Sequence, residues 1–237
     1  MKLIVDAYIP ARSGSTRVIG KNIRLLAGHP LIAYTIAAAI QSGIFRHVIV
    51  TSDSVDTLDI AVKYGAKGQL RSAKNAETLS MDIDWLREVV ENEAKQPEYF
   101  AILRPTSPFR QPETIRQAWR QLQYDTYATG LKAVSPVCPG KMWVVDGLYM
   151  EPLLSYPRHN GQPAYNCPTQ VLPVAWKQNS SLDMGLVRNI TIRGDIYGAK
   201  IIPFHSPLYE DVNIDEEVDF LWAEFLVEKK IATLPII

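Results

Sequence analysis

Short apolar runs alternate with amphipathic segments along this chain of 237 residues, and this alternation constrains its fold most. Each run is short enough for a buried strand, and the segment after it carries apolar residues at helical spacing. The expected strands are Leu3–Ile9, His47–Thr51, Lys67–Leu70, Tyr99–Leu103 and Lys200–Phe204. The expected helices are Leu31–Gln41, Val55–Tyr64, Asp82–Glu93, Glu113–Gln123 and Asp215–Lys229. Such alternation predicts βαβ units, and therefore an α/β fold with a doubly wound, mostly parallel sheet.

The region from about residue 136 to residue 180 breaks this rhythm. It holds seven prolines, at Pro136, Pro139, Pro152, Pro157, Pro163, Pro168 and Pro173. It also holds apolar side chains that we expect to be buried, namely Trp143, Val144, Val145, Leu148, Tyr149 and Met150. We interpret this region as an irregular insertion in a single domain that spans residues 1–237.

The charge balance argues against a partner that is recognised by a global electrostatic field. Lys plus Arg and Asp plus Glu number 25 each, so we expect neither nucleic acid nor a membrane surface as a partner. No apolar run approaches the roughly 18 residues of a membrane span. Asp6 also interrupts the N-terminal apolar run, so we expect no signal peptide and a cytoplasmic location. In that compartment Cys138 and Cys167 are expected to be free thiols.

The loop from Pro10 to Asn22 concentrates small residues together with Arg12, Arg17 and Lys21. A Gly/Ser-rich turn that leaves a parallel strand lets backbone N–H groups approach a polyphosphate, and nearby cations offset its charge. An ordinary strand–helix connection with solvated basic side chains is the alternative. The spacing excludes a Walker A loop, because Gly14 to Gly20 is one residue too long and Asn22 stands in place of Ser or Thr.

The same loop resembles the signature of the sugar-activating cytidylyltransferases, whose best-known members are the CMP-sialic acid synthetases. The matching residues are Ile9-Pro10-Ala11-Arg12, Gly14-Ser15 and Lys21-Asn22, followed by Pro30–Ile36, Arg104–Arg110 and Glu210–Asn213. The resemblance implies a Rossmann-like nucleotidyltransferase fold and a Mg²⁺-dependent reaction. In that reaction CTP and a sialic-acid-like nonulosonic acid give a CMP-sugar and pyrophosphate. It also implies a homodimer formed through the insertion.

The resemblance assigns site residues position by position. Lys21 and Arg12 are the catalytic candidates, with Lys21 stabilising charge near the α-phosphate. The nucleotide-binding candidates are Ala11, Arg12, Gly14, Ser15, Lys21, Asn22, Arg71, Ser80 and Arg104. Ser80 could instead be the N-cap of the helix that follows it. The acceptor-binding candidates are Arg104, Lys141 and Gln170.

Asp211 and Asn213 match the family's Asp-x-Asp and are the candidate magnesium ligands. One carboxylate together with phosphate oxygens can suffice for Mg²⁺, and the amide oxygen of Asn213 would be a weaker ligand. Alternatively, the acidic residues from Asp211 to Asp215 only lead into the last helix.

Two departures from the family leave the substrate open. Arg104 replaces the usual glutamine and adds a permanent charge that can only donate hydrogen bonds. Pro168-Thr169 stands before Gln170, where sialic-acid-activating relatives carry an arginine. A guanylyl- or uridylyltransferase acting on a sugar 1-phosphate is therefore the alternative, and a non-catalytic nucleotide-binding module is a remoter one.

Overall fold

The computed structural model describes residues 3–77, 79–153 and 158–237. Its contacts divide the chain into two units. The first unit comprises Met1–Ala133 with Asn179–Ile237, and the second comprises Val134–Gln178. Pro157 lies outside the described residues.

A seven-stranded sheet forms the centre of the first unit. Its strands are β1 (Val5–Pro10), β4 (Val48–Ser52), β5 (Lys67–Leu70), β6 (Tyr99–Leu103), β7 (Gly130–Val137), β12 (Ala175–Leu186) and β13 (Ile201–His205). Their order is β13-β7-β12-β6-β1-β4-β5. Strands β6, β1, β4 and β5 are parallel, whereas β12 runs antiparallel to β6. This confirms the predicted α/β class and mostly parallel sheet, although β7 and β12 were not expected from the sequence.

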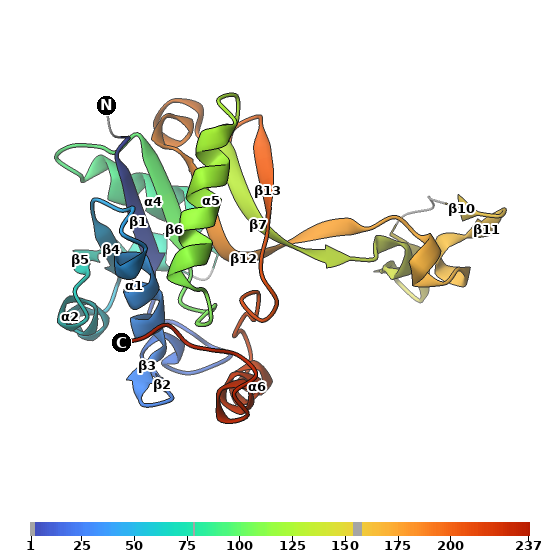
Figure 1. Ribbon diagram of the computed structural model, residues 1–237, viewed down its shortest axis with the longest axis horizontal. Helices are drawn as coiled ribbons and strands as arrows, with labels where there is room; N and C mark the ends of the chain where they lie inside the picture. The colour runs from blue at the N-terminus through green and yellow to red at the C-terminus, as the bar shows by residue number, and fades with distance from the viewer. Residues whose placement is uncertain (1–2, 78, 154–157) are drawn as a thin grey trace. The chain divides into compact units, whose positions relative to one another are not determined.

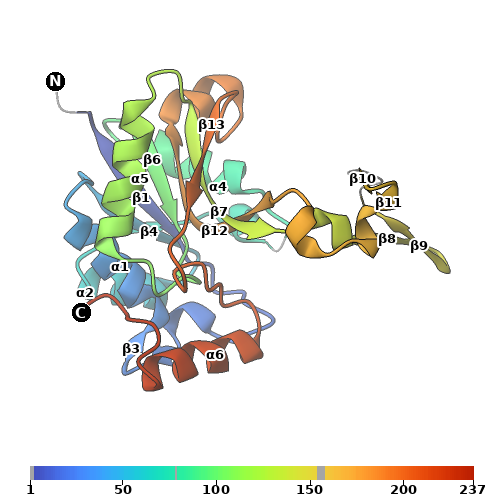
Figure 2. The same cartoon turned by 45° about the vertical axis from the view of Figure 1, so that its right-hand side comes forward.

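Helices cover both faces of this sheet (Figures 1 and 2). They are α1 (Leu31–Ser42), α2 (Val55–Lys63), α3 (Ala73–Ala76), α4 (Asp82–Glu91), α5 (Pro112–Tyr124) and α6 (Glu217–Glu228). Helices α1 and α5 lie on one face of the sheet and α4 lies on the other (Figure 1). The doubly wound arrangement follows, because helices on both faces bury both sides of the strands.

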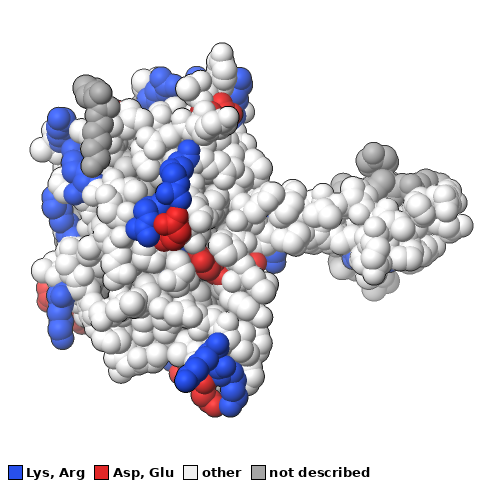
Figure 3. Space-filling model, in the orientation of Figure 1, with Lys and Arg blue, Asp and Glu red and all other residues white. Residues whose placement is uncertain are grey.

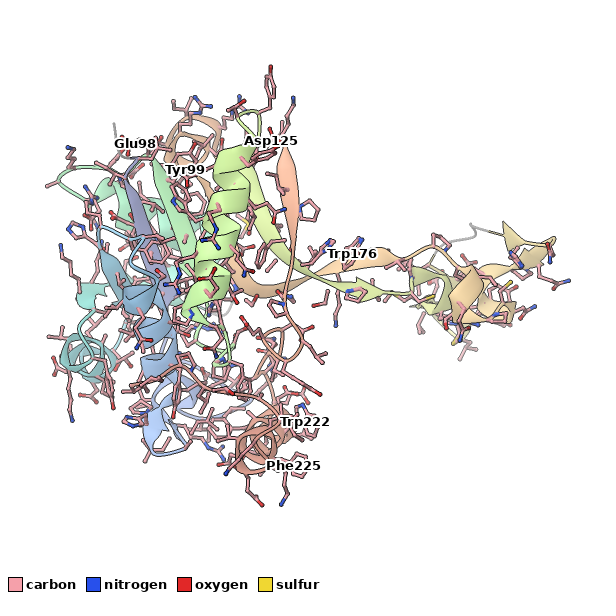
Figure 4. The ribbon with its side chains drawn as sticks, in the orientation of Figure 1. Glu98, Tyr99, Asp125, Trp176, Trp222 and Phe225 are labelled. Carbon is pink, nitrogen blue, oxygen red and sulfur yellow. The ribbon has the colours of Figure 1, made fainter. Side chains whose placement is uncertain are left out.

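Strand β1 shows how the alternating pattern serves the two faces. Ala7 and Ile9 pack into the core cluster that includes α1 and α5 residues. Tyr8 points to the opposite face, into the cluster built around α4. On the α5 side, Tyr99 and Trp119 meet edge to face with ring centroids 5.1 Å apart, and Figure 4 labels Tyr99 at the start of β6. Successive strand residues therefore bury opposite faces, as the two-residue period requires.

Helix α6 packs its buried face against the segment before α1, which holds the short strands β2 (Leu25–Leu26) and β3 (His29–Pro30). The helix was predicted to begin at Asp215, but it begins at Glu217, because Glu216 is its N-cap and forms a capping box with Asp219. On its exposed face Trp222 and Phe225 stack with centroids 5.4 Å apart (Figure 4).

Besides the ends of β7 and β12, the described residues of the second unit form two short hairpins and three 3₁₀ turns. The hairpins pair β8 (Trp143–Asp146) with β9 (Tyr149–Pro152) and β10 (Arg158–His159) with β11 (Gln162–Pro163). The 3₁₀ turns are Pro139–Lys141, Ala164–Asn166 and Thr169–Val171. Its buried cluster is small, comprising Ala164, Cys167 and Leu172 with Cys138 beside them. Both cysteines are free thiols.

The prediction that the insertion buries its apolar side chains is wrong for a single copy of the chain. All six side chains are exposed, from 39% for Trp143 to 95% for Leu148. The physical reason is the hairpin of β8 and β9, which has no layer of this chain's described residues packed on it.

Charged side chains on the face that carries α5 include a mixed acidic and basic group over that helix (Figure 3). There Glu113 pairs with both Arg116 and Arg120. Among the described residues, no helix combines the length and the apolar character needed to cross a membrane.

Candidate functional site

A cleft of about 300 Å³ lies at the carboxyl ends of the parallel strands of the first unit. Ligands bind at this edge in open α/β sheets because the loops that leave the strands converge there. Its described cationic lining residues are Arg12, Arg17, Lys21, Arg71 and Arg104. Its described acidic lining residues are Glu77, Asp82 and Asp215. Five cations against three carboxylates suit an anionic ligand.

The loop from Pro10 to Asn22 is fixed from two sides. The backbone N–H and the Oγ of Ser13 each donate to Asp53 at 2.7 Å, just after β4. Partial burial opposes the charge of Asp53, but these hydrogen bonds outweigh it and lower the pKa of its carboxyl. Inside the loop, Asn22 Nδ2 donates to the carbonyl oxygen of Arg12 at 3.1 Å. Asn22 therefore positions the backbone that carries Arg12.

Arg12 and Lys21 differ in how they are held. Within the described part of the chain, the Arg12 guanidinium makes no hydrogen bond or ion pair. Lys21 Nζ donates to the carbonyl oxygen of Ile214 at 2.7 Å and lies 3.2 Å from Asp215 Oδ1. The Arg12 guanidinium is therefore available to a ligand, whereas the Lys21 side chain is held in place by Ile214 and Asp215, in the segment before α6.

Three small residues of the loop take different positions. Ser15 lines the cleft. Ala11 is buried beneath it, with its N–H donated to Thr51. At Gly14, no described heavy atom lies within 4 Å of the position that a Cβ would take. Neither crowding nor a left-handed backbone requires glycine there, and Gly14 is exposed and is not among the lining residues of the cleft.

Arg71 forms the wall of the cleft that follows β5. Its guanidinium donates to Thr51 and lies over the Trp85 ring at 4.8 Å. Burial lowers the pKa of Arg71 to about 10, so the side chain stays charged at neutral pH. Ser80 lines the same wall and donates from Oγ to the carbonyl oxygen of Lys74. The alternative in which Ser80 caps α4 is wrong, because Met81 is the N-cap.

Arg104 reaches the cleft from the end of β6 with its charge already paired. Its Nη2 lies 2.6 Å from Asp82 and 3.7 Å from the buried Asp183. Burial opposes the charge of Arg104, but the two carboxylates outweigh it and raise its pKa. The loop after Arg104 is held by Arg110, whose Nη2 donates to the Arg104 carbonyl oxygen at 2.8 Å. The additional charge noted from the sequence is therefore neutralised within the chain.

The segment before α6 brings Asp215 to the cleft, whereas Asp211 and Asn213 are not among its lining residues. Asn213 instead donates from Nδ2 to Asp215 Oδ2 at 2.5 Å. The sequence interpretation missed Asp215, although Asn213-x-Asp215 has the same spacing as Asp211-x-Asn213. The Asp215 carboxylate is a hard oxygen ligand of the kind that Mg²⁺ prefers, and it lines the cleft beside Lys21 and Arg17.

Lys141 and Gln170 belong to the second unit, whereas all the described cleft residues belong to the first. Lys141 Nζ donates to the carbonyl oxygen of Tyr165 at 2.8 Å. The side chain of Gln170 is exposed.

Two solved structures share this architecture over nearly the whole chain. A CMP:2-keto-3-deoxy-manno-octonic acid synthetase complexed with CTP matches with a TM-score of 0.70 at 16% identity, over 96% of this chain and 99% of that one. A 4-diphosphocytidyl-2C-methyl-D-erythritol synthase from Anaerococcus prevotii matches with a TM-score of 0.65 at 12% identity, over 96% and 100%. These likenesses confirm the fold.

Sequence similarity is closer and identifies the family. The CMP-N,N'-diacetyllegionaminic acid synthase of Legionella pneumophila is 34% identical over 234 residues, which cover 94% of this chain and 95% of that protein. The N-acylneuraminate cytidylyltransferase of Escherichia coli is 41% identical over 123 residues, or 52% of this chain and 29% of that protein. The Pseudaminic acid cytidylyltransferase of Campylobacter jejuni is 32% identical over 117 residues, or 48% and 50%. Residues 7–139 match the family model described as Cytidylyltransferase. The predicted resemblance is confirmed, and the chain belongs to the cytidylyltransferase family.

Proposed function

We propose that this protein transfers a cytidylyl group from CTP to a hydroxyl of a nonulosonic acid, giving a CMP-sugar and pyrophosphate. The observation that carries the proposal is the similarity to a CMP-N,N'-diacetyllegionaminic acid synthase along 94% of this chain and 95% of that protein. The cleft is a second, independent support for an anionic substrate such as a nucleoside triphosphate, because cationic side chains of the loop after β1 line it.

The chain's own residues divide the work of this reaction. The acceptor oxygen bonds to the α-phosphorus, the bond from that phosphorus to the bridging oxygen breaks, and pyrophosphate leaves with the electron pair. The acceptor's proton passes to solvent. Arg12 is a free cation that can bind the triphosphate, and Lys21 can stabilise charge on the α-phosphate oxygens. Gly14 stays a predicted contact to the phosphates through its backbone N–H.

Mg²⁺ is the cofactor that this site fits. Asp215 supplies a cleft carboxylate, and phosphate oxygens of the nucleotide can complete the coordination, since Mg²⁺ often takes only one or two carboxylates. When bound, the ion neutralises charge on the phosphate oxygens. Asp211 and Asn213 remain predicted ligands, and Asp215 joins them as a carboxylate that lines the cleft beside Lys21.

A nonulosonic acid remains the favoured acceptor over a sugar 1-phosphate. The alternative gained support from the charge of Arg104, which could have served an additional phosphate. That charge is paired with Asp82 and Asp183, so it gives no reason to invoke a second phosphate group.

A homodimer formed through the second unit is part of the proposal. The hairpin of β8 and β9 exposes Val145, Leu148 and Tyr149, and a contiguous exposed apolar surface is typical of an interface. A second copy of the chain can cover it. Sedimentation should give a dimer at micromolar concentration and a monomer for Leu148→Asp combined with Tyr149→Asp, and a monomeric unmodified protein rejects this part.

The experiment that tests the function is pyrophosphate release with Mg²⁺, using CTP, GTP, UTP and ATP in turn. Each nucleotide is combined with N,N'-diacetyllegionaminic acid, N-acetylneuraminic acid, pseudaminic acid and sugar 1-phosphates. We expect turnover only with CTP and a nonulosonic acid. Turnover only with a sugar 1-phosphate, or only with another nucleotide, would reject the proposal in favour of the alternative.

A further inference from the structure

Asp215 faces the cleft with both of its carboxylate oxygens already engaged. Oδ1 lies 3.2 Å from Lys21 Nζ and 3.5 Å from Arg17 Nη2. Oδ2 accepts a hydrogen bond from Asn213 Nδ2 at 2.5 Å. The backbone N–H of Asp215 donates to Asp219 Oδ2 at 2.9 Å, which ties the residue to the first turn of α6. The carboxylate is therefore fixed in place, and its charge is neutralised by this chain's own cations.

The two cations that neutralise Asp215 are held very differently. The Lys21 side chain is 11% exposed and has a second anchor in the Ile214 carbonyl oxygen. The Arg17 side chain is 62% exposed, and its ion pair with Asp215 is the longer of the two. An exposed pair of this length is weak. Arg17 can therefore leave Asp215 at small cost, whereas Lys21 stays.

A divalent cation and a polyphosphate act on Arg17 in opposite ways. A divalent cation at Asp215 would be repelled by the guanidinium next to it. Phosphate oxygens attract a guanidinium strongly, because its planar donors match their geometry. A triphosphate in the cleft therefore draws Arg17 away from the carboxylate that the metal needs.

We propose, on the basis of the proposed function, that Arg17 is a positioning residue that couples metal binding to nucleotide binding. In the empty cleft Arg17 caps Asp215. When the nucleotide enters, the guanidinium moves to its phosphates. Asp215 Oδ1 then keeps only its contact with Lys21 and can accept a divalent cation on the side that Arg17 has left. Asn213 reinforces the coupling, because its side-chain N–H occupies Asp215 Oδ2. An aspartate at position 213 would instead add a second negative charge, which would attract the metal even without nucleotide.

The first test measures Mn²⁺ binding to the nucleotide-free protein by loss of the free Mn²⁺ electron paramagnetic resonance signal. The unmodified protein should bind Mn²⁺ weakly. Arg17→Met should tighten this binding about fivefold by removing an adjacent positive charge, and Asn213→Asp should tighten it by about tenfold. Arg120→Met is the matched control. The Arg120 side chain is also 62% exposed and also pairs with a carboxylate, that of Glu113, but it belongs to α5, which contributes no lining residue to the cleft. It should leave Mn²⁺ binding unchanged.

The second test measures CTP binding without metal by isothermal titration calorimetry. Arg17→Met should weaken it about fivefold, and Arg120→Met should not. Adding Asp215→Asn to Arg17→Met should abolish the gained Mn²⁺ affinity, which locates the ion at Asp215.

Tight Mn²⁺ binding to the unmodified, nucleotide-free protein would overturn the coupling, as would an unchanged Mn²⁺ affinity in Arg17→Met. Equal CTP affinity in Arg17→Met and Arg120→Met would overturn the proposal that the Arg17 guanidinium moves to the nucleotide's phosphates. The proposed function fails separately, through absent pyrophosphate release from CTP and nonulosonic acids. Mn²⁺ titration of the nucleotide-free protein does not depend on that turnover.

Discussion

Two clusters of charged side chains lie at opposite ends of the parallel strands, and they use the same chemistry in different surroundings. The Asp6 cluster, near the start of β1, contains Asp6, Arg46, His47 and Glu93. The Asp215 cluster, at the cleft, contains Asp215, Arg17, Lys21 and Asn213. Each has a carboxylate next to an arginine. The side chain of Asp6 is fully buried, whereas that of Asp215 is 39% exposed.

Burial changes what the arginine does. Arg46 donates to both oxygens of Asp6 and, through Nη2, to the Lys95 carbonyl oxygen, so it is locked. The ligand atoms of Asp6, His47 and Glu93 lie within 4.8 Å of one another, a spacing that could hold a metal ion. Arg46 already supplies the positive charge there. Arg17, by contrast, forms a single ion pair with the described residues, at 3.5 Å, and its side chain stays exchangeable. The comparison suggests that a saturated, buried pair supports the fold, whereas a loosely paired, solvated carboxylate can serve a ligand.

The largest expected effect is loss of stability in Arg46→Met. The substitution leaves Asp6 buried without its bidentate partner, next to Tyr8, whose hydroxyl is buried with no hydrogen-bond partner among the described residues. Breaking a buried ion pair on one side costs about 3 to 5 kcal/mol. Urea denaturation should show a loss of that size in the free energy of unfolding. Arg17→Met should change it by less than about 1 kcal/mol.

A paired substitution sharpens the comparison. Removing both charges, with Asp6→Leu and Arg46→Met together, should recover much of the lost stability, because no uncompensated buried charge remains. A double variant that is as unstable as Arg46→Met alone would show that shape, rather than charge pairing, holds this end of the sheet.

Lys21→Met should have the next largest effect, on turnover rather than stability. Removing one stabilising charge from the reacting phosphate typically costs a factor of about 100 to 1000 in kcat. Pyrophosphate release should fall by that amount, while the urea midpoint changes little because Lys21 bonds only at the cleft edge. A variant that loses stability as Arg46→Met does, with kcat unchanged, would place Lys21 with the structural cluster.

The same contrast explains how much of the fold the sequence could predict. Strand β6 coincides with the expected Tyr99–Leu103, and α4 begins at the expected Asp82, because apolar periodicity reports burial directly. Strand β12 was missed because its residues Ala175–Leu186 include polar side chains. Some of those, such as Asp183, are buried by pairing with distant charges.

For the site, motif spacing found the loop cations but not their partners. Arg12, Lys21 and Asn22 line one cleft, and their roles in binding the nucleotide stay predictions. Asp82 was not singled out, because an acidic residue at a helix start carries no distinctive sequence signal. Asp215 was missed because the family's Asp-x-Asp was matched two residues earlier, at Asp211 and Asn213. Their role emerges only when Arg104 and Lys21 are brought next to them.

The smallest expected effect is the pH-dependent loss of stability in Arg104→Gln, which tests a pair intermediate between the two clusters. Burial raises the pKa of the Asp183 carboxyl, and Arg104 opposes that rise. Without Arg104 the pKa should rise further. The ionised carboxylate then costs the folded state free energy whenever the pH lies above the unfolded-state pKa of about 4. Near pH 7 the loss should be about 1 to 2 kcal/mol, because other partners of Asp183 remain.

That loss should shrink as the pH falls through the raised pKa and vanish near the unfolded-state value, where Asp183 is protonated in both states. Urea denaturation between pH 4 and 8 measures it. The double variant Arg104→Gln with Asp183→Asn should lose the pH dependence, because no titrating group remains at the buried position. A loss of unfolding free energy that is constant with pH would mean that Arg104 acts through packing rather than through its charge. Arg104 would then resemble the arginines of neither the Asp6 cluster nor the Asp215 cluster.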